Sequence, residues 1–160
     1  MKNSIISAID LCLKIRHQRP AFWPCILIAH SEDINLDNDN LKSLVDVIFD
    51  EDKSIGKLYV QVNYDVMASK GVLGNFEKLT IRSKFRENDE EDDHYIWVEA
   101  ESKDAVASVV SYLLEELLSL HDFEDIGMVI TDVRTVDEYI VMDMDGAWRR
   151  MIGFSDIENK

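Results

Sequence analysis

The stretch His94–Leu120, HYIWVEAESKDAVASVVSYLLEELLSL, decides how this chain folds. Its first part alternates apolar and polar residues, with Ile96 and Val98 on one side, which is the period-two pattern of a strand with one buried face. Ser102 is suited to cap a helix, and from Val106 to Leu120 large apolar residues recur at steps of three and four. We therefore predict a strand that leads directly into the main core helix.

On the N-terminal side of this stretch, the pattern predicts helix, strand and helix in turn. Apolar residues at helical spacing favour a helix over Ser4–Ile15, and the prolines of 20–24 then require a loop. Cys25–Ala29 is a short apolar run typical of a buried strand, and the polar residues 31–40 predict a loop. Leu41–Phe49 again has apolar residues at helical spacing, so we expect a second helix there.

The middle of the chain reads as a meander of strands. Leu58–Tyr64 alternates apolar and polar residues and predicts a half-buried strand, followed by an irregular connection over 68–75 that contains two glycines. Phe76–Arg86 alternates in the same way and predicts the next strand. The acidic residues of 87–93 would then form a hairpin loop that leads back into the strand of the opening stretch.

The C-terminal part adds two strands and a tail. Met128–Val133 and Tyr139–Met142 are rich in β-branched and apolar residues, and we expect both to be strands. The tail Ala147–Phe154 carries apolar residues that suit a short terminal helix packed on the sheet. Taken together, residues 1–160 predict one α+β domain, with a mostly antiparallel sheet of about five to six strands and helices packed chiefly on one face.

The charge of the chain limits its partners. The chain holds 32 Asp and Glu against 17 Lys and Arg, a formal net charge of −15. Such a field repels nucleic acid and anionic membranes and attracts basic proteins, so we expect neither direct nucleic-acid binding nor membrane binding. No apolar run is long enough to cross a bilayer and the N-terminus lacks the pattern of a secretory signal, which predicts a cytoplasmic protein.

No motif in the chain identifies a reaction. The four histidines are scattered, and no nucleophile stands beside a base, no phosphate loop is present and no metal-ligand spacing occurs. Cys12 and Cys25 fall in apolar segments and are expected to be buried free thiols. We therefore predict a protein that is not an enzyme and that needs neither a cofactor nor a metal.

One surface stands out as a candidate for binding another protein. If the strands around the acidic loop pair as a hairpin, Arg82 and Lys84 lie on the same face as Tyr95, Trp97 and Glu99. Aromatic side chains on such a face, Tyr59 among them, are either covered by another element or form an interface.

Two segments, LYVQV at 58–62 and YIWVEAES at 95–102 leading into a long apolar helix, resemble those of small acidic α+β proteins that include bacterial secretion-type chaperones. The size and charge resemble those of immunity proteins of contact-dependent growth inhibition and other toxin–immunity pairs. The resemblance covers about 58–120. The prolines of 20–24 and the helix expected over 41–49 depart from the chaperone pattern, so immunity is favoured.

The resemblance to immunity proteins implies an inhibitor that binds a cognate toxin, typically a basic nuclease, and covers its active or substrate-binding surface. Carboxylates would meet the Lys and Arg that hold phosphates, and aromatic anchors would add affinity. The residues expected to bind the partner are Asp89, Glu90, Glu91, Asp92, Asp93, Tyr95, Trp97, Glu99, Asp50, Glu51 and Asp52. The alternatives are a secretion chaperone or adaptor that binds a client segment, and a small enzyme or ligand-binding domain; the oligomeric state is left open.

Overall fold

A computed structural model describes residues 2–30, 43–50, 57–87, 95–118, 126–143 and 148–152. Its helices are α1 (Lys2–Gln18), α2 (Tyr64–Ser69), α3 (Leu73–Lys78) and α4 (Lys103–Leu118), with a short 3-10 helix, η2 (Thr80–Lys84). Its strands are β1 (Pro24–His30), β2 (Val45–Phe49), β3 (Leu58–Asn63), β4 (Arg86–Glu87), β5 (Tyr95–Ala100), β6 (Ile126–Asp132), β7 (Thr135–Asp143) and β8 (Trp148–Ile152).

Within the described residues, the strands form one eight-stranded sheet in the order β4-β5-β3-β2-β1-β6-β7-β8. Each neighbouring pair in that order is antiparallel. The predicted α+β class with an antiparallel sheet is confirmed, although the number of strands is higher than the five to six expected. The sheet brings β1, at the start of the chain, beside β6 from its last third.

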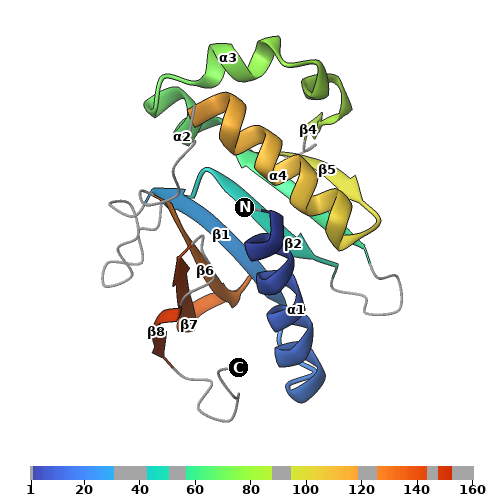
Figure 1. The fold of residues 1–160 in the computed structure, drawn as a ribbon, viewed down its shortest axis with the longest axis vertical. Coiled ribbons are helices and arrows are strands. Elements are labelled where there is room, and N and C mark those ends of the chain that lie inside the picture. The colour runs from blue at the N-terminus through green and yellow to red at the C-terminus, as the bar shows by residue number, and fades with distance from the viewer. Residues whose placement is uncertain are drawn as a thin grey trace.

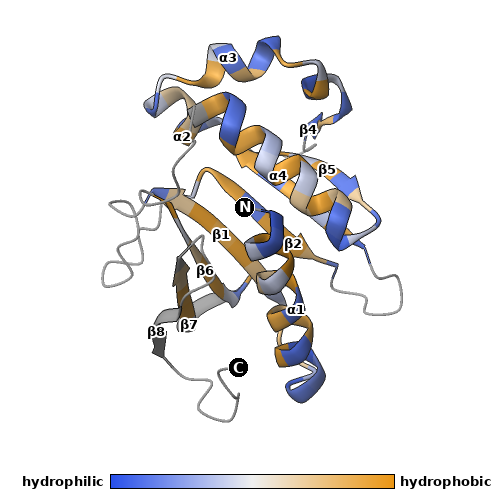
Figure 2. Ribbon diagram, in the orientation of Figure 1, coloured by the Kyte–Doolittle hydropathy of each residue, from blue (hydrophilic) through white to orange (hydrophobic). Residues whose placement is uncertain are grey.

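The core lies between one face of this sheet and the helices, and we call this the helix face. Figure 1 shows α1 and α4 lying in front of β1, β2 and β5, and Figure 2 shows that β1 and β2 are strongly hydrophobic where the helices cover them. Along β3, Leu58, Val60 and Val62 are buried while the residues between them are only half-buried. This alternation confirms that β3 turns one face to the core.

The opening stretch has the structure that its pattern predicts. Residues 95–100 form β5, and Ser102 caps the helix that follows, since its hydroxyl accepts a hydrogen bond from the Ala105 amide at 3.1 Å. The apolar stripe of α4 is buried throughout its described part, at Val106, Ala107, Val110, Leu113, Leu114 and Leu117. Burial of each large side chain contributes about 1.5–3 kcal/mol, so α4 is the main helical contributor to the core.

The helix predicted over Leu41–Phe49 is wrong, because Val45–Phe49 is strand β2 at the centre of the sheet. Both periods fit this short apolar run, and hydrogen bonding to β1 on one side and β3 on the other selects the strand. One of the two departures from the chaperone pattern therefore disappears.

The strand predicted over Phe76–Arg86 and the irregular connection before it are also wrong. Residues 64–84 form α2, α3 and η2, and only Arg86–Glu87 pairs with β5. The Asn63 side chain starts the first helix by accepting hydrogen bonds from the Asp65 and Val66 amides, at 2.9 and 3.2 Å. This cap ends β3 and turns the chain out of the sheet.

Arg82 holds this helical insertion together. Its guanidinium donates to the Tyr64 hydroxyl at 2.6 Å and pairs with Glu77 at 3.2 Å and Glu87 at 3.3 Å. It also lies over the rings of Tyr64 and Phe76. The alternation of basic residues in this segment therefore does not mark a strand, and Arg82 instead holds a helical cluster together.

At the C-terminal end, the predicted terminal helix is wrong, since Trp148–Ile152 forms the edge strand β8.

Hydrogen bonds to Asp132 join this half of the sheet to the loop between α1 and β1. Asp132 accepts two hydrogen bonds from the Arg134 side chain, at 2.9 and 2.8 Å, and one from the Trp23 amide at 3.1 Å. These bonds, with Arg134 first, lower the pKa of Asp132 to about 2.

Candidate functional site

The candidate site lies on the sheet face opposite the helix face, over β3, β4 and β5. Side chains there are only half-buried at Tyr59, Gln61 and Trp97, whereas on the same face Val129, Thr131 and Tyr139 of the other half of the sheet are buried. Leu27, Ile48 and Val141, which share this face, are also half-buried, so its accessible surface continues from β3 and β5 across β2 and β1 to β7. We call the part over β3, β4 and β5 the aromatic face and define it by Tyr59, Gln61, Arg86, Trp97 and Glu99.

Two aromatic rings form the centre of the aromatic face. Strand register places Gln61 opposite Trp97 and Tyr59 opposite Glu99, so Tyr59 and Trp97 are diagonal neighbours. Their ring centroids are 5.6 Å apart at an interplanar angle of 84°, an edge-to-face contact of the kind that aromatic pairs favour. Each ring thus contacts the other, and the Tyr59 ring is also held through its hydroxyl, which hydrogen-bonds to Asp50.

A cation covers the outer side of this pair. Arg86 of β4 is the cross-strand neighbour of Trp97, and its guanidinium carbon lies 5.5 Å from the centre of the indole ring. Such a cation–π contact contributes about 0.5–1 kcal/mol at an exposed site. The arginine therefore packs on the indole and places a positive charge beside the aromatic pair.

Polar contacts fix the edge of the aromatic face nearest to β2. The Tyr59 hydroxyl donates to the Asp50 carboxylate at 3.0 Å, and Lys57 pairs with Glu99 at 3.5 Å. Partial burial and then the Asp50 carboxylate raise the pKa of Tyr59. Tyr59 is therefore a hydrogen-bond donor in this site and not a nucleophile or base at neutral pH.

A buried carboxylate lies beside the site, on the neighbouring strand. Asp46 of β2 is 6% exposed, and its side chain accepts a hydrogen bond from Gln61 at 3.4 Å. Burial raises the pKa of Asp46 to about 6, against the opposing effect of hydrogen bonds from Ser43 and Gln61. A carboxylate so enclosed has no access to a substrate on the aromatic face.

Three of the residues expected to bind a partner come together here. Trp97 and Glu99 lie on the aromatic face, and Asp50 lies at its edge through Tyr59. The side chain of Tyr95 lies outside the described part, although its backbone is in β5. The remaining predicted contacts, Glu51, Asp52 and Asp89–Asp93, also lie outside the described residues.

The predicted partners of the aromatic residues are wrong, since Arg82 and Lys84 belong to η2 and not to a strand beside β5. Their places are taken by Arg86, which lies over Trp97, and by Lys57, which pairs with Glu99. Sequence reasoning named neither residue for this role. The signal was available for both residues, because Lys57 shares the parity of Tyr59 and Arg86 shares the parity of Arg82 and Lys84.

No three of the described His, Cys, Asp and Glu side chains come together in a way that could hold a metal ion. Cys12 and Cys25 are both buried and free, and burial raises the pKa of each thiol, which makes them poor nucleophiles. Among the described helices, none has the length and apolar character needed to cross a membrane.

Comparison with known proteins gives no relative: no family model, no curated protein and no solved structure matches this chain.

Proposed function

We propose that this chain is a non-catalytic inhibitor that binds a basic protein, as an immunity protein binds its cognate toxin. The observation that carries the proposal is the edge-to-face pair of Tyr59 and Trp97, half-buried on an accessible sheet face and flanked by Arg86. Trp, Tyr and Arg are the residue types that dominate binding energy in protein interfaces. The three stand together on adjacent strands.

The chemistry of this face suits recognition better than catalysis. Its polar groups are already engaged: the Tyr59 hydroxyl donates to Asp50, and Glu99 pairs with Lys57. A prearranged aromatic surface loses little conformational entropy on binding, so most of the energy gained from its burial is available as affinity. An interface anchor needs this property, whereas a catalytic site needs a reactive group.

The acidic composition supports a basic partner. With a net charge of −15, the chain attracts cations over its whole surface, and a nuclease toxin presents Lys and Arg where it binds phosphates. Carboxylates near the aromatic face, with Asp50 and Glu99 among the described ones, would occupy those groups. Inhibition then follows from steric cover of the nuclease surface.

The test is co-expression with a candidate basic nuclease toxin domain, followed by measurement of affinity with purified proteins. Trp97→Ala is expected to weaken binding by about thirtyfold or more, which corresponds to at least 2 kcal/mol, and to restore toxicity. Tyr112→Ala is the matched control, because Tyr112 is 38% exposed on α4 and lies away from the sheet face. It is expected to leave the affinity unchanged.

A toxin that is bound and neutralised equally well by Trp97→Ala would rule out the aromatic face as the contact surface. Failure of the wild-type chain to bind or neutralise the toxin would remove the inhibitor role itself.

A further inference from the structure

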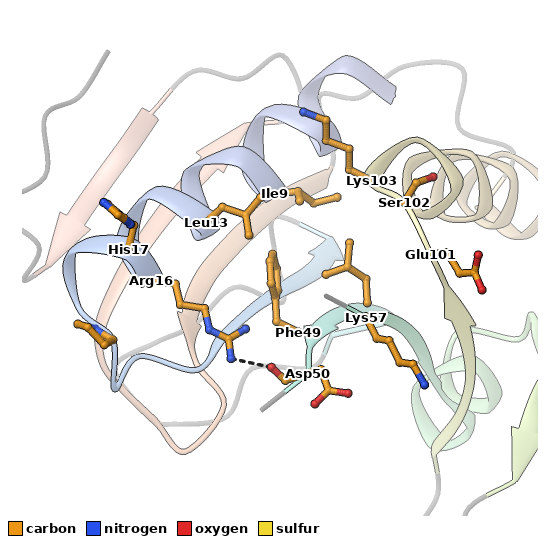
Figure 3. Close-up of a pocket in the computed structure, with 12 residues that line it drawn as sticks. Ile9, Leu13, Arg16, His17, Phe49, Asp50, Lys57, Glu101, Ser102 and Lys103 are labelled. Carbon is orange, nitrogen blue, oxygen red and sulfur yellow. Dashed lines mark hydrogen bonds between the residues drawn. The ribbon is translucent and has the colours of Figure 1, made fainter. Parts of the chain in front are cut away.

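The end of strand β2 is held by hydrogen bonds to three other parts of the chain. The Arg16 guanidinium, from α1, donates to the Asp50 carbonyl at 2.7 Å (Figure 3). The Trp23 indole N–H, from the loop between α1 and β1, donates to the Phe49 carbonyl at 2.6 Å. The Asp50 amide donates to the carbonyl of Lys57, just before β3, at 3.1 Å. Successive backbone groups of Phe49 and Asp50 are thus bonded to distant segments.

Asp50 connects this end of β2 to the aromatic face. Its carboxylate accepts the hydrogen bond from the Tyr59 hydroxyl at 3.0 Å, and the Tyr59 ring makes the edge-to-face contact with Trp97. Only two side-chain torsions lie between the Cα of an aspartate and its carboxylate oxygens. The position of the Asp50 backbone therefore decides where the acceptor for the Tyr59 hydroxyl lies.

Arg16 reaches Asp50 from the helix face of the sheet. Helix α1 packs on that face through Ile9 and Ile15, both 0% exposed, and Arg16 follows Ile15 directly. Figure 1 shows α1 in front of the sheet, whereas Tyr59 belongs to the aromatic face on the other side. The contacts from Arg16 through Asp50 to Tyr59 therefore join the two faces around the end of β2.

Trp23 reaches Phe49 from a backbone that is itself bonded to the end of β6. The Trp23 amide donates to the Asp132 carboxylate at 3.1 Å, and the Trp23 carbonyl accepts from the Val133 amide at 2.9 Å. Asp132 is in turn paired with Arg134 at 2.8 Å. The indole N–H is thus presented to the Phe49 carbonyl from a fixed loop.

We propose that Arg16 and Trp23 are positioning residues for partner binding, because they hold the Phe49–Asp50 backbone and so keep the Tyr59 ring in the orientation that the partner meets. A ring that is held before binding loses less conformational freedom when the partner covers it. The effect on affinity rests on the proposed inhibitor function, whereas the effect on Tyr59 is a property of the free protein.

The first experiment follows the Tyr59 ring of the free, full-length protein by NMR during a pH titration. Arg16→Met keeps the apolar stem without the donors, Trp23→Phe keeps an aromatic ring without the N–H, and Asp50→Ala removes the acceptor. The Tyr59 shifts of the first two variants are expected to move toward those of Asp50→Ala.

The pKa of Tyr59 gives an independent readout in the same titration. Partial burial and then the Asp50 carboxylate raise this pKa, so a weaker contact with Asp50 is expected to lower it in both variants. Loss of the Arg16 charge alone would raise it, because a nearby cation favours the phenolate. A fall in Arg16→Met is therefore specific to the lost Asp50 contact.

The second experiment measures affinity for a candidate basic nuclease toxin domain in a double-mutant cycle. Arg16→Met and Trp23→Phe are each expected to weaken binding by about threefold to tenfold, the effect of one hydrogen bond. In the Tyr59→Phe background, which lacks the hydroxyl, each should change it by less than about twofold. A general loss of stability would act equally in both backgrounds.

Two further variants serve as controls. Lys103→Met also removes one positive charge beside α1, but Lys103 pairs with Asp10 at 2.9 Å, so the Tyr59 shifts should stay unchanged and the affinity should stay within about twofold of wild type. Arg16→Lys keeps a cationic donor on the same helix and is expected to restore both readouts in part.

Tyr59 shifts and a Tyr59 pKa that match wild type in both Arg16→Met and Trp23→Phe would overturn the positioning role, whatever the partner. Equal losses of affinity with and without the Tyr59 hydroxyl would overturn it as well. Failure of the wild-type chain to bind the toxin would instead count against the inhibitor function, and the Tyr59 measurements in the free protein would still decide the positioning role.

Discussion

Asp46 shows how a single residue can connect stability to pH in this protein. It lies at the centre of the sheet beside Leu27 and Gln61, where its charge is poorly solvated. Its pKa rises from 3.8 to about 6, chiefly because burial disfavours the ionised form. The folded state therefore holds the proton more tightly than the unfolded chain does.

The sign of the resulting effect is fixed by this difference. As pH rises from about 4 to about 6, the folded protein must give up a proton that the unfolded chain has already lost, so Asp46 lowers the free energy of unfolding over that range. We expect the stability of Asp46→Asn relative to wild type to increase by about 2 kcal/mol between about pH 4.5 and about pH 8. Urea denaturation at a series of pH values measures this difference.

Glu116→Gln, on the exposed side of α4, is the matched control, because it removes one carboxylate without touching the core. If the difference between Asp46→Asn and wild type did not change with pH, Asp46 would not titrate as its burial requires.

At the scale of the element, two leucines of α4 and α1 differ sharply in how far they are buried. Leu113 of α4 is 0% exposed within the core, whereas Leu13 of α1 is 48% exposed on the wall of a pocket of about 560 Å³. The stripe of α4 was predictable because its spacing repeats over four turns. The exposure of Leu13 was not, because it depends on the gap that α1 leaves beside Phe49 and Leu58.

This contrast gives a direct test. Leu113→Ala is expected to reduce the free energy of unfolding by about 2–5 kcal/mol, because it leaves a cavity in the core. Leu13→Ala is expected to change it by less than about 0.5 kcal/mol, as is usual for exposed positions. Chemical denaturation measures both values, and a Leu13→Ala cost equal to that of Leu113→Ala would show that Leu13 belongs to the core and not to the exposed surface.

At the scale of the whole molecule, charge and apolar contacts contribute to partner recognition at different distances. The net charge of −15 acts over distances of about 10 Å and speeds the approach of a basic protein, while Tyr59 and Trp97 act only in contact. The two contributions should therefore separate in kinetic measurements.

We expect the association rate with the toxin to fall by about tenfold or more as salt rises from about 50 mM to about 500 mM. Neutralising Asp89–Asp93 with the corresponding amides should flatten this dependence, whereas Trp97→Ala should leave the dependence and increase the dissociation rate. Surface plasmon resonance at several salt concentrations measures both rates. An association rate independent of salt would contradict electrostatic steering, though not contact through the aromatic face.

The amino-acid sequence by itself determined the elements whose signals lie within neighbouring residues. Alternation placed β3 and β5, helical spacing with a serine cap placed α4, and apolar spacing placed α1. The same alternation put Tyr59 and Trp97 on one face, because parity along a strand is a local property. The α+β class followed from these elements together.

Only the tertiary structure decided the segments whose local signals were ambiguous. Val45–Phe49 is a strand because β1 and β3 supply hydrogen bonds on both sides, and Thr80–Lys84 leaves the sheet because Arg82 gathers Tyr64, Glu77 and Glu87 around it. The pocket lined by Ile9, Phe49 and Lys103 likewise needs α1, β2 and the start of α4 to meet. Such contacts join residues far apart in the chain, and no local period encodes them.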